Sequence, residues 1–178
     1  MHIQKVIVHK FAAVLAASPL PSLAIPASPH ASLIARLDRL GSTAKEIAQI
    51  GAAIGREFSY ELIAAVAPMK EPGLGIALKR LTDSGLAFRR GMPPDASYIF
   101  KHALVQDATY DMLLLSRRRD LHGKIARALE DRFPETVSTE PELLARHFAE
   151  AGIADAAIAY WLKASKRSIS RSAYREAL

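Results

Sequence analysis

Lys101 and His102 are the residues whose types and position best suit a chemical role, because they stand where a predicted strand passes into a predicted helix. The strand-forming residues 98–100 come directly before them, and a helical spacing of apolar residues begins at Leu104. The N-terminus of a helix attracts anions, since its first backbone N–H groups have no partner within the helix. A histidine beside a lysine at such a position suits a phosphate group. The other interpretation is that His102 caps or packs the helix and binds no ligand.

The sequence has no loop that could hold the phosphates of a nucleoside triphosphate. The pattern G-x-x-x-x-G-K-[ST] does not occur, and the glycine-rich segment 73–79 has a different spacing and is predicted to begin a helix. We therefore expect no catalytic residues, no cofactor bound by this chain alone and no enzymatic activity.

Other polar residues are expected to have structural roles. His122 and His147 fall on helical faces, where we expect them to pack or to lie at the surface rather than to bind a metal. Asp107 and Asp111 are one helical turn apart and are expected to be solvated. Ser116 has no histidine and acid placed to activate it, and it is predicted to cap the helix that follows.

Composition favours a mainly α-helical globular protein. Half of the 178 residues are hydrophobic, and there is no cysteine to form a disulfide, a thiolate metal site or a thiol nucleophile. The net charge of +6 is spread along the chain, which predicts a solvated basic surface rather than a nucleic-acid site. No apolar run approaches the roughly 18 residues that span a bilayer, so we expect no membrane contact. The absence of cysteine fits a cytoplasmic protein, which is the expected location. Residues 1–21 resemble a signal peptide only weakly, because Lys10 interrupts their apolar run.

The first part of the chain is predicted to form helices after a linker. Four prolines within residues 18–30 predict an extended segment. A short helix should then end at Gly41, and three more helices should begin near Thr43, Ser59 and Glu71. Thr43 and Ser59 are the predicted N-caps of the first two of these three helices.

A β-hairpin is predicted to follow these helices, with strands at 86–90 and 98–101. Three helices followed by a hairpin are typical of a winged helix, a relative of the helix-turn-helix. Winged helices often bind DNA, and Lys79 and Arg80 lie on the helix that would enter the groove. That helix begins with Glu71, which repels phosphate, and offers no cluster of side chains for base edges. A small winged-helix DNA-binding transcriptional regulator is therefore the alternative function.

Two more helices and a helical hairpin are predicted after the strands. The spacing of Leu121, Ile125 and Leu129 predicts a helix that Pro134 ends, and residues 134–141 are predicted to form a loop.

Helices at 142–151 and 154–168 should then pair across Gly152, an arrangement typical of the start of a tetratricopeptide array. A further helix is predicted to begin at 171. Trp161, Tyr160 and Phe148 lie on the contacting faces of this pair and are the candidate residues for binding a protein partner.

Several phrases of the sequence resemble one protein family. They are F-K-H-A-L-V-Q-D-A-T-Y (100–110), S-R-R-R-D-L-H-G-K-I-A-R-A-L-E (116–130), residues 25–41 and residues 48–63. In this order they are similar to the winged-helix region of STAND-type signal-transduction ATPases that are associated with class III adenylate or guanylate cyclases. The resemblance covers roughly residues 19–178.

The resemblance implies a fragment that follows a nucleotide-binding domain, with the cyclase and P-loop domains absent. In this family the histidine after the wing reaches the phosphates of ADP, and that role would fall to His102, beside Lys101. ADP or ATP would thus be ligands of a longer parent protein. The implied partners are a separate NTPase domain or a protein bound by the tetratricopeptide-like helices.

The sequence therefore predicts a mainly α fold with a winged helix, a helical linker and the start of an α-solenoid. The predicted function is a non-catalytic regulatory and protein-interaction fragment of such an ATPase. The expected units are 1–30 (N-terminal segment and proline-rich linker), 31–41 (connecting helix), 42–101 (winged helix), 102–134 (two-helix linker) and 135–178 (truncated tetratricopeptide-like hairpin).

Overall fold

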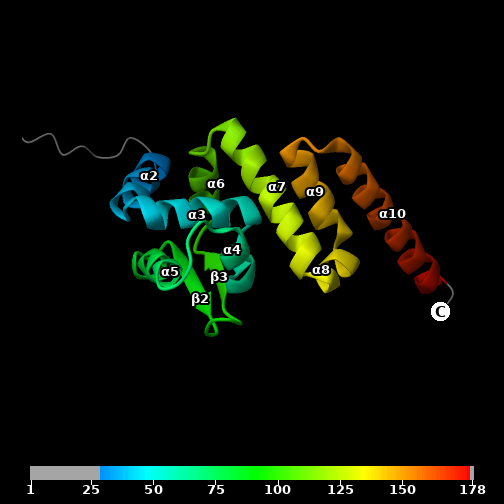
Figure 1. The fold of residues 1–178 in the computed structure, drawn as a ribbon, viewed down its shortest axis with the longest axis horizontal. Helices are drawn as coiled ribbons and strands as arrows, with labels where there is room; N and C mark the ends of the chain where they lie inside the picture. Colours follow the sequence, from blue (N-terminus) through cyan, green and yellow to red (C-terminus); the bar gives the residue numbers. More distant parts are fainter. Residues whose placement is uncertain (1–28, 177–178) are drawn as a thin grey trace, which may run out of the picture.

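The structure is a computed structural model that describes residues 29–176, and it is mainly helical with one small sheet (Figure 1). The expected N-terminal segment and nearly all of the proline-rich linker lie outside the described residues. The described elements are α2 (Pro29–Arg39), α3 (Ser42–Ile54), β1 (Glu57–Ser59), α4 (Tyr60–Val66), α5 (Gly73–Asp83), β2 (Ala87–Arg90), β3 (Ser97–Phe100), α6 (Ala103–Asp111), α7 (Leu115–Arg132), α8 (Pro134–Thr139), α9 (Pro141–Ala151) and α10 (Ala154–Glu176).

Helix α3 is the centre of the N-terminal half, where α4, α5, α6, α7 and β1 all pack against it. Its sequence is rich in alanine and isoleucine, and Ile47 and Ile50 are fully buried. Gly51 lets the ring of Phe58 approach the helix, since a Cβ at Gly51 would lie 2.6 Å from a ring carbon. The small residue therefore fixes how closely β1 packs on α3.

The sheet has three antiparallel strands in the order β1-β3-β2. Phe58 of β1 faces Tyr98 of β3, and the two rings stack with their centroids 5.7 Å apart. Phe58 also contacts Phe100, whose ring centroid is 5.6 Å away. The sequence analysis predicted no strand at 57–59. Three residues are too few to show the alternation of apolar and polar side chains that indicates a strand.

The structure confirms one of the predicted caps and corrects two. The side chain of Ser59 accepts a hydrogen bond from the backbone N–H of Leu62 at 3.1 Å, so it caps α4 as predicted. The cap at Thr43 is wrong, because α3 begins one residue earlier and Gly41 holds its N-cap position without a side chain. The cap at Ser116 is also wrong, because α7 already begins at Leu115.

Helices α5 and α6 each bury one face. Helix α5 buries Leu78 and Leu81 and leaves Ile76 exposed. Helix α6 buries Val105 and Ala108, whereas Leu104, at which the predicted helical spacing begins, is exposed. The core contact of α6 is therefore displaced around the helix axis from the face that begins at Leu104.

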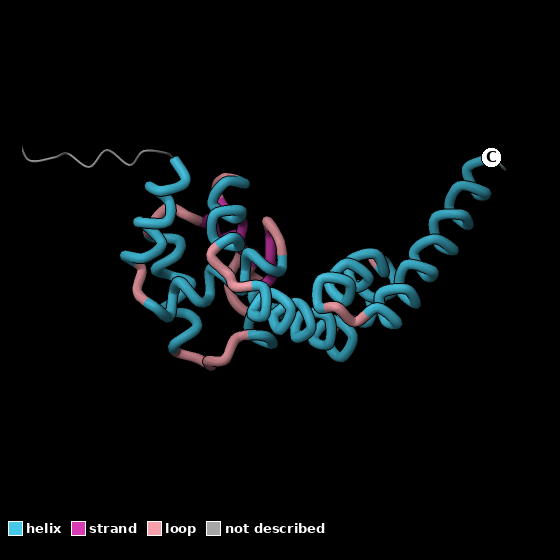
Figure 2. Tube along the Cα trace, turned by 90° about the horizontal axis from the view of Figure 1, so that it is seen from above, coloured by secondary structure: helices cyan, strands magenta, loops and turns pink. Residues whose placement is uncertain are grey.

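The C-terminal half consists of α7 to α10. Residues 134–139, predicted to be a loop, form the short helix α8, since a proline is well tolerated in the first turn of a helix. Gly152 ends α9 in the left-handed conformation at φ 78°, as its type suggests. Helix α10 is continuous to Glu176, so the separate helix predicted to begin at 171 is wrong. Its second half extends away from the other elements in both views (Figures 1 and 2).

The helices of residues 29–176 give no candidate for a membrane span, because none of them is both long enough and apolar enough.

Candidate functional site

Lys101 and His102 connect the sheet to α6. The backbone of β3 is held on both sides here, because the N–H of Phe100 donates to the carbonyl of Arg56 and the N–H of Lys101 donates to the carbonyl of Leu86, each at 3.0 Å. His102 is the N-cap residue of α6, with an extended backbone at φ −136° and ψ 145°. Its position is therefore set by the sheet and by the helix together.

The side chain of His102 is exposed and makes no capping hydrogen bond to α6. The carbonyl of His102 instead accepts from the N–H of Val105 at 3.0 Å, so its backbone starts the helix. The Nζ of Lys101 lies over the ring of Phe88, 5.6 Å from its centroid. A cation and an imidazole thus stand at the positive end of a helix whose first turn has no acidic residue, which suits an anion.

The candidate partner residues of the helical hairpin separate into two groups. Phe148 of α9 and Tyr160 of α10 are buried and stack on each other with their centroids 5.6 Å apart. The hydroxyl of Tyr160 also donates to Oε1 of Glu130 on α7 at 2.6 Å. Trp161 is half exposed. Of the three, only Trp161 presents its ring to solvent, while the other two hold α10 on α9.

Sequence reasoning missed a buried polar chain between α6, α7 and α9. The hydroxyl of Tyr110 lies 2.9 Å from Nε2 of His122, and Nδ1 of His122 lies 2.8 Å from Nδ1 of His147. Both histidines are buried, and Nε2 of His147 has no hydrogen-bond partner. The only signal in the sequence was that each histidine falls on the inner face of its helix, and it did not show that the two would meet.

Burial keeps both histidines neutral. Burial, together with the nearby His122 and Arg146, lowers the pKa of His147 to about 3. Burial also lowers the pKa of His122, where the carboxylate of Glu150 opposes the shift and the guanidinium groups of Arg146 and Arg118 add to it. The two neutral histidines therefore pack and hydrogen-bond between α7 and α9, which is a structural role.

A small open cleft of about 180 Å³ lies beside this chain, between the end of α3 and helices α6, α7 and α9. Two side chains tie the end of α3 to the neighbouring helices across it. The amide of Gln106 donates to the carbonyl of Ala52, and the guanidinium of Arg146 donates to the carbonyl of Ile54, each at 3.3 Å. The C-terminal carbonyls of α3 thus find partners on α6 and α9.

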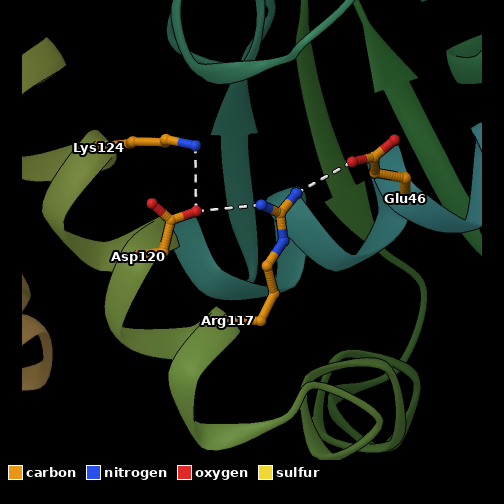
Figure 3. Close-up of polar contacts among 4 residues, drawn as sticks. All are labelled: Glu46, Arg117, Asp120 and Lys124. Atoms are coloured by element: carbon orange, nitrogen blue, oxygen red, sulfur yellow. Dashed lines mark hydrogen bonds and ion pairs between the residues drawn. The ribbon is translucent and has the colours of Figure 1, made fainter.

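A second polar connection joins α3 to α7 (Figure 3). The guanidinium of Arg117 bridges Oε1 of Glu46 and Oδ2 of Asp120, with both N–O distances at 3.0 Å. Lys124 completes the group through Asp120. Glu46 of α3 therefore binds a side chain of α7.

No group of three or more histidine, aspartate and glutamate side chains within residues 29–176 could hold a metal ion. The two histidines with a direct contact are hydrogen-bonded to each other and not arranged around a shared point.

Comparison with known proteins gives one informative relative. The chain is 32% identical over 146 residues to an uncharacterized protein of Rhizobium meliloti (strain 1021). The match covers 82% of this chain but only 14% of that protein, so the chain spans about one seventh of the relative's length. No protein-family model matches the chain, and no solved structure matches it.

Proposed function

We propose that this chain is a non-catalytic regulatory and protein-interaction module of a STAND-type, adenylate-cyclase-associated signalling ATPase. Its parts would be a winged helix, a two-helix linker and the first hairpin of a tetratricopeptide-like array. The proposal rests on the fold order, on the helical hairpin and above all on the placement of His102.

The order of elements supports a winged helix. Helix α3, strand β1, helices α4 and α5, and the hairpin β2–β3 follow one another as in that module. Strand β1 pairs with β3, so the hairpin closes on the first strand and the three helices share one core.

The C-terminal part supports the start of a helical array. Helix α10 packs mainly on α9, and α9 packs in turn on α7, so the helices form a layer in which each contacts its neighbour. The relative in Rhizobium meliloti is far longer than the matched segment, which is the setting expected for a module within a large signalling protein.

The observation that carries the proposal is the exposed side chain of His102 at the start of α6. The fold fixes the backbone of this residue but does not use its imidazole as a helix cap. In a longer polypeptide, His102 and Lys101 would contact the phosphates of ADP held by a nucleotide-binding domain. Helices α6 and α7 would then pass the nucleotide state to the hairpin, because α7 contacts both α3 and α9.

The test begins with the native product in cells, detected by an antibody against residues 43–178. A product several times larger than 19.4 kDa supports the proposal. The chromosomal His102→Ala variant should then copurify with much less ADP than the native product does, at equal abundance. Asp107→Asn, an exposed change one turn further along α6, is the matched control and should retain the ADP. A product of 19.4 kDa, or a His102→Ala variant with full ADP content, would overturn nucleotide sensing.

The alternative of a DNA-binding regulator predicts a different result. Lys79 on the exposed face of α5 is paired with Asp83 at 2.6 Å, and Ile76 lies exposed on the same helix. These features weaken a role in the major groove, where free basic and amide groups are needed. The alternative requires binding to duplex DNA that falls steeply between about 50 and 200 mM salt and is lost in an Arg89→Ala, Arg90→Ala double variant.

A further inference from the structure

Helix α10 has two apolar faces, and only one of them is used within the described chain. Ala157 and Tyr160 are buried against α9. On another face Ile158, Trp161, Leu162 and Ile169 are 57%, 50%, 57% and 66% exposed. At 3.6 residues per turn these four side chains fall within a stripe about 100° wide. We call these four residues the outer stripe.

The outer stripe is the densest group of exposed large apolar side chains on one element of the described structure. Trp161 lies at its edge and is the single tryptophan of the protein. Contiguous exposed apolar surface marks interaction sites, and tryptophan is enriched among the residues that dominate binding energy. The first half of α10 packs on α9 through its other face, and the second half extends away from the rest of the molecule, so a partner can approach the outer stripe (Figure 2).

The charge of α10 selects the kind of partner. Lys163, Lys166, Arg167 and Arg171 share the helix with the outer stripe, and no acidic residue occurs between Ala156 and Arg171. Two copies of this helix would therefore repel each other if they paired along their length. An acidic partner would be attracted instead, and its carboxylates would face Lys166, which borders the outer stripe.

The spacing of the stripe favours a helix over a lipid surface. Its residues follow one another at three, one and seven positions, which matches the anchors of a helix-helix contact. Ser165 interrupts the stripe, and Ser168 and Ser170 flank Ile169. A helix that lies in a bilayer interface needs a continuous apolar face along its length.

We propose that the outer stripe of α10 binds an acidic amphipathic helix. This inference rests on the proposed role as a protein-interaction module and names its partner: a helix with an apolar stripe flanked by aspartate and glutamate. Trp161, Leu162 and Ile158 would bury their side chains in the contact, and Lys166 would pair with a carboxylate of the partner.

The test uses the whole chain and a synthetic peptide of about 18 residues, with leucine on one helical face and glutamate on the others. Trp161 serves as the built-in reporter, since burial of its ring shifts its emission to the blue. We expect a saturable blue shift with this peptide. A peptide in which every glutamate is replaced by lysine should give none.

Variants distinguish the outer stripe from other exposed apolar residues. Leu162→Ser and Lys166→Glu should each weaken binding about tenfold or more, because they remove an anchor or invert the local charge. Leu115→Ser, at an exposed leucine of α7, should bind as the native chain does and is the matched control. Far-ultraviolet circular dichroism shows that each variant keeps its helices.

Three results would overturn the inference. They are equal binding of the lysine peptide, a blue shift only with vesicles that contain anionic lipid, and concentration-dependent dimerisation that Leu162→Ser abolishes. The peptide-binding test does not depend on the size of the native product or on the ADP content of His102→Ala. A negative result for the outer stripe can therefore be distinguished from a failure of the proposed function.

Discussion

The Nδ1 atoms of His122 and His147 face each other at 2.8 Å, so one ring must donate the shared proton and the other must accept it. This requires at least one uncharged ring, since two imidazolium groups would both present a donor. Charged groups surround the pair on two of the helices that form it, with Arg118 on α7 and Arg146 and Glu150 on α9. Protonation of both rings would therefore break this hydrogen bond and place two positive charges side by side between α7 and α9.

Acid should destabilise the protein through this pair. The folded-state pKa of His147 is about 3 against an ordinary value of 6.5, so the unfolded chain binds more protons between these two values. The contribution to stability is complete above about pH 6.5 and is lost as the pH falls towards 3, with a slope of at most about 1.4 kcal/mol per pH unit for each histidine. Urea unfolding followed by circular dichroism at a series of pH values measures this slope.

The variant His147→Gln should have a shallower slope, because glutamine can hydrogen-bond to His122 without titrating. Its stability at neutral pH should fall, since the buried ring is lost. His102→Gln, which replaces an exposed histidine, is the matched control and should keep the native slope. An unchanged slope in His147→Gln would mean that other groups carry the acid sensitivity.

Arg117 should contribute a small, salt-sensitive energy to the contact between α3 and α7. It is 39% exposed and Glu46 is 38% exposed, so water screens the pair. A double-mutant cycle with Glu46→Gln and Arg117→Met should give a coupling of about 0.5–1 kcal/mol at low salt. The coupling should shrink as salt is added. As a control, the same cycle with the exposed neighbour Arg119 in place of Arg117 should give no coupling energy. A coupling energy with Arg119 would show that the cycle measures the change in net charge and not the ion pair.

The helices could be predicted where burial follows local spacing. Leu121, Ile125 and Leu129 are all buried as their spacing indicated, and Ser59 caps α4 because the cap bond lies within one turn. Strand β1 could not be predicted, since its three residues gain their partners from β3, far along the chain. The segment after Pro134 was misassigned because proline is equally typical of a loop and of a helix start.

In the candidate site, too, features set by neighbouring residues could be predicted and features set by helix packing could not. The N-cap position of His102 could be predicted because neighbouring residues show where the strand ends and the helix begins. The contact between His122 and His147 depends on how α7 packs against α9, and nothing in the spacing of either helix encodes it. The outward position of Trp161 likewise depends on which face of α10 meets α9. An aromatic pair in sequence, at 160 and 161, gives no means to choose between them.

Gly51 and Gly123 should respond in opposite directions to alanine. A Cβ at Gly51 would lie 2.6 Å from the buried ring of Phe58, which Tyr98 and Phe100 hold in place. Gly51→Ala should therefore cost about 1–3 kcal/mol of unfolding free energy. Gly123→Ala would meet only an ordinary contact at 3.7 Å on α9 and should stabilise the protein by up to about 1 kcal/mol through better helix propensity. Chemical denaturation measures both, and a neutral Gly51→Ala would show that β1 does not pack tightly on α3.

Substitutions at Trp161 and Phe148 should separate the surface of the hairpin from its core. The ring of Trp161 is half exposed, so Trp161→Ala should cost less than about 1 kcal/mol of unfolding free energy. Phe148→Ala removes a buried ring that stacks on Tyr160 and should cost about 3–5 kcal/mol. Tyr160→Phe keeps the stack and removes only the hydrogen bond to Glu130, so its cost should be about 1 kcal/mol. Thermal unfolding followed by circular dichroism ranks the three. If Trp161→Ala were as damaging as Phe148→Ala, the tryptophan would be part of the hairpin's own core and would not belong to the outer stripe.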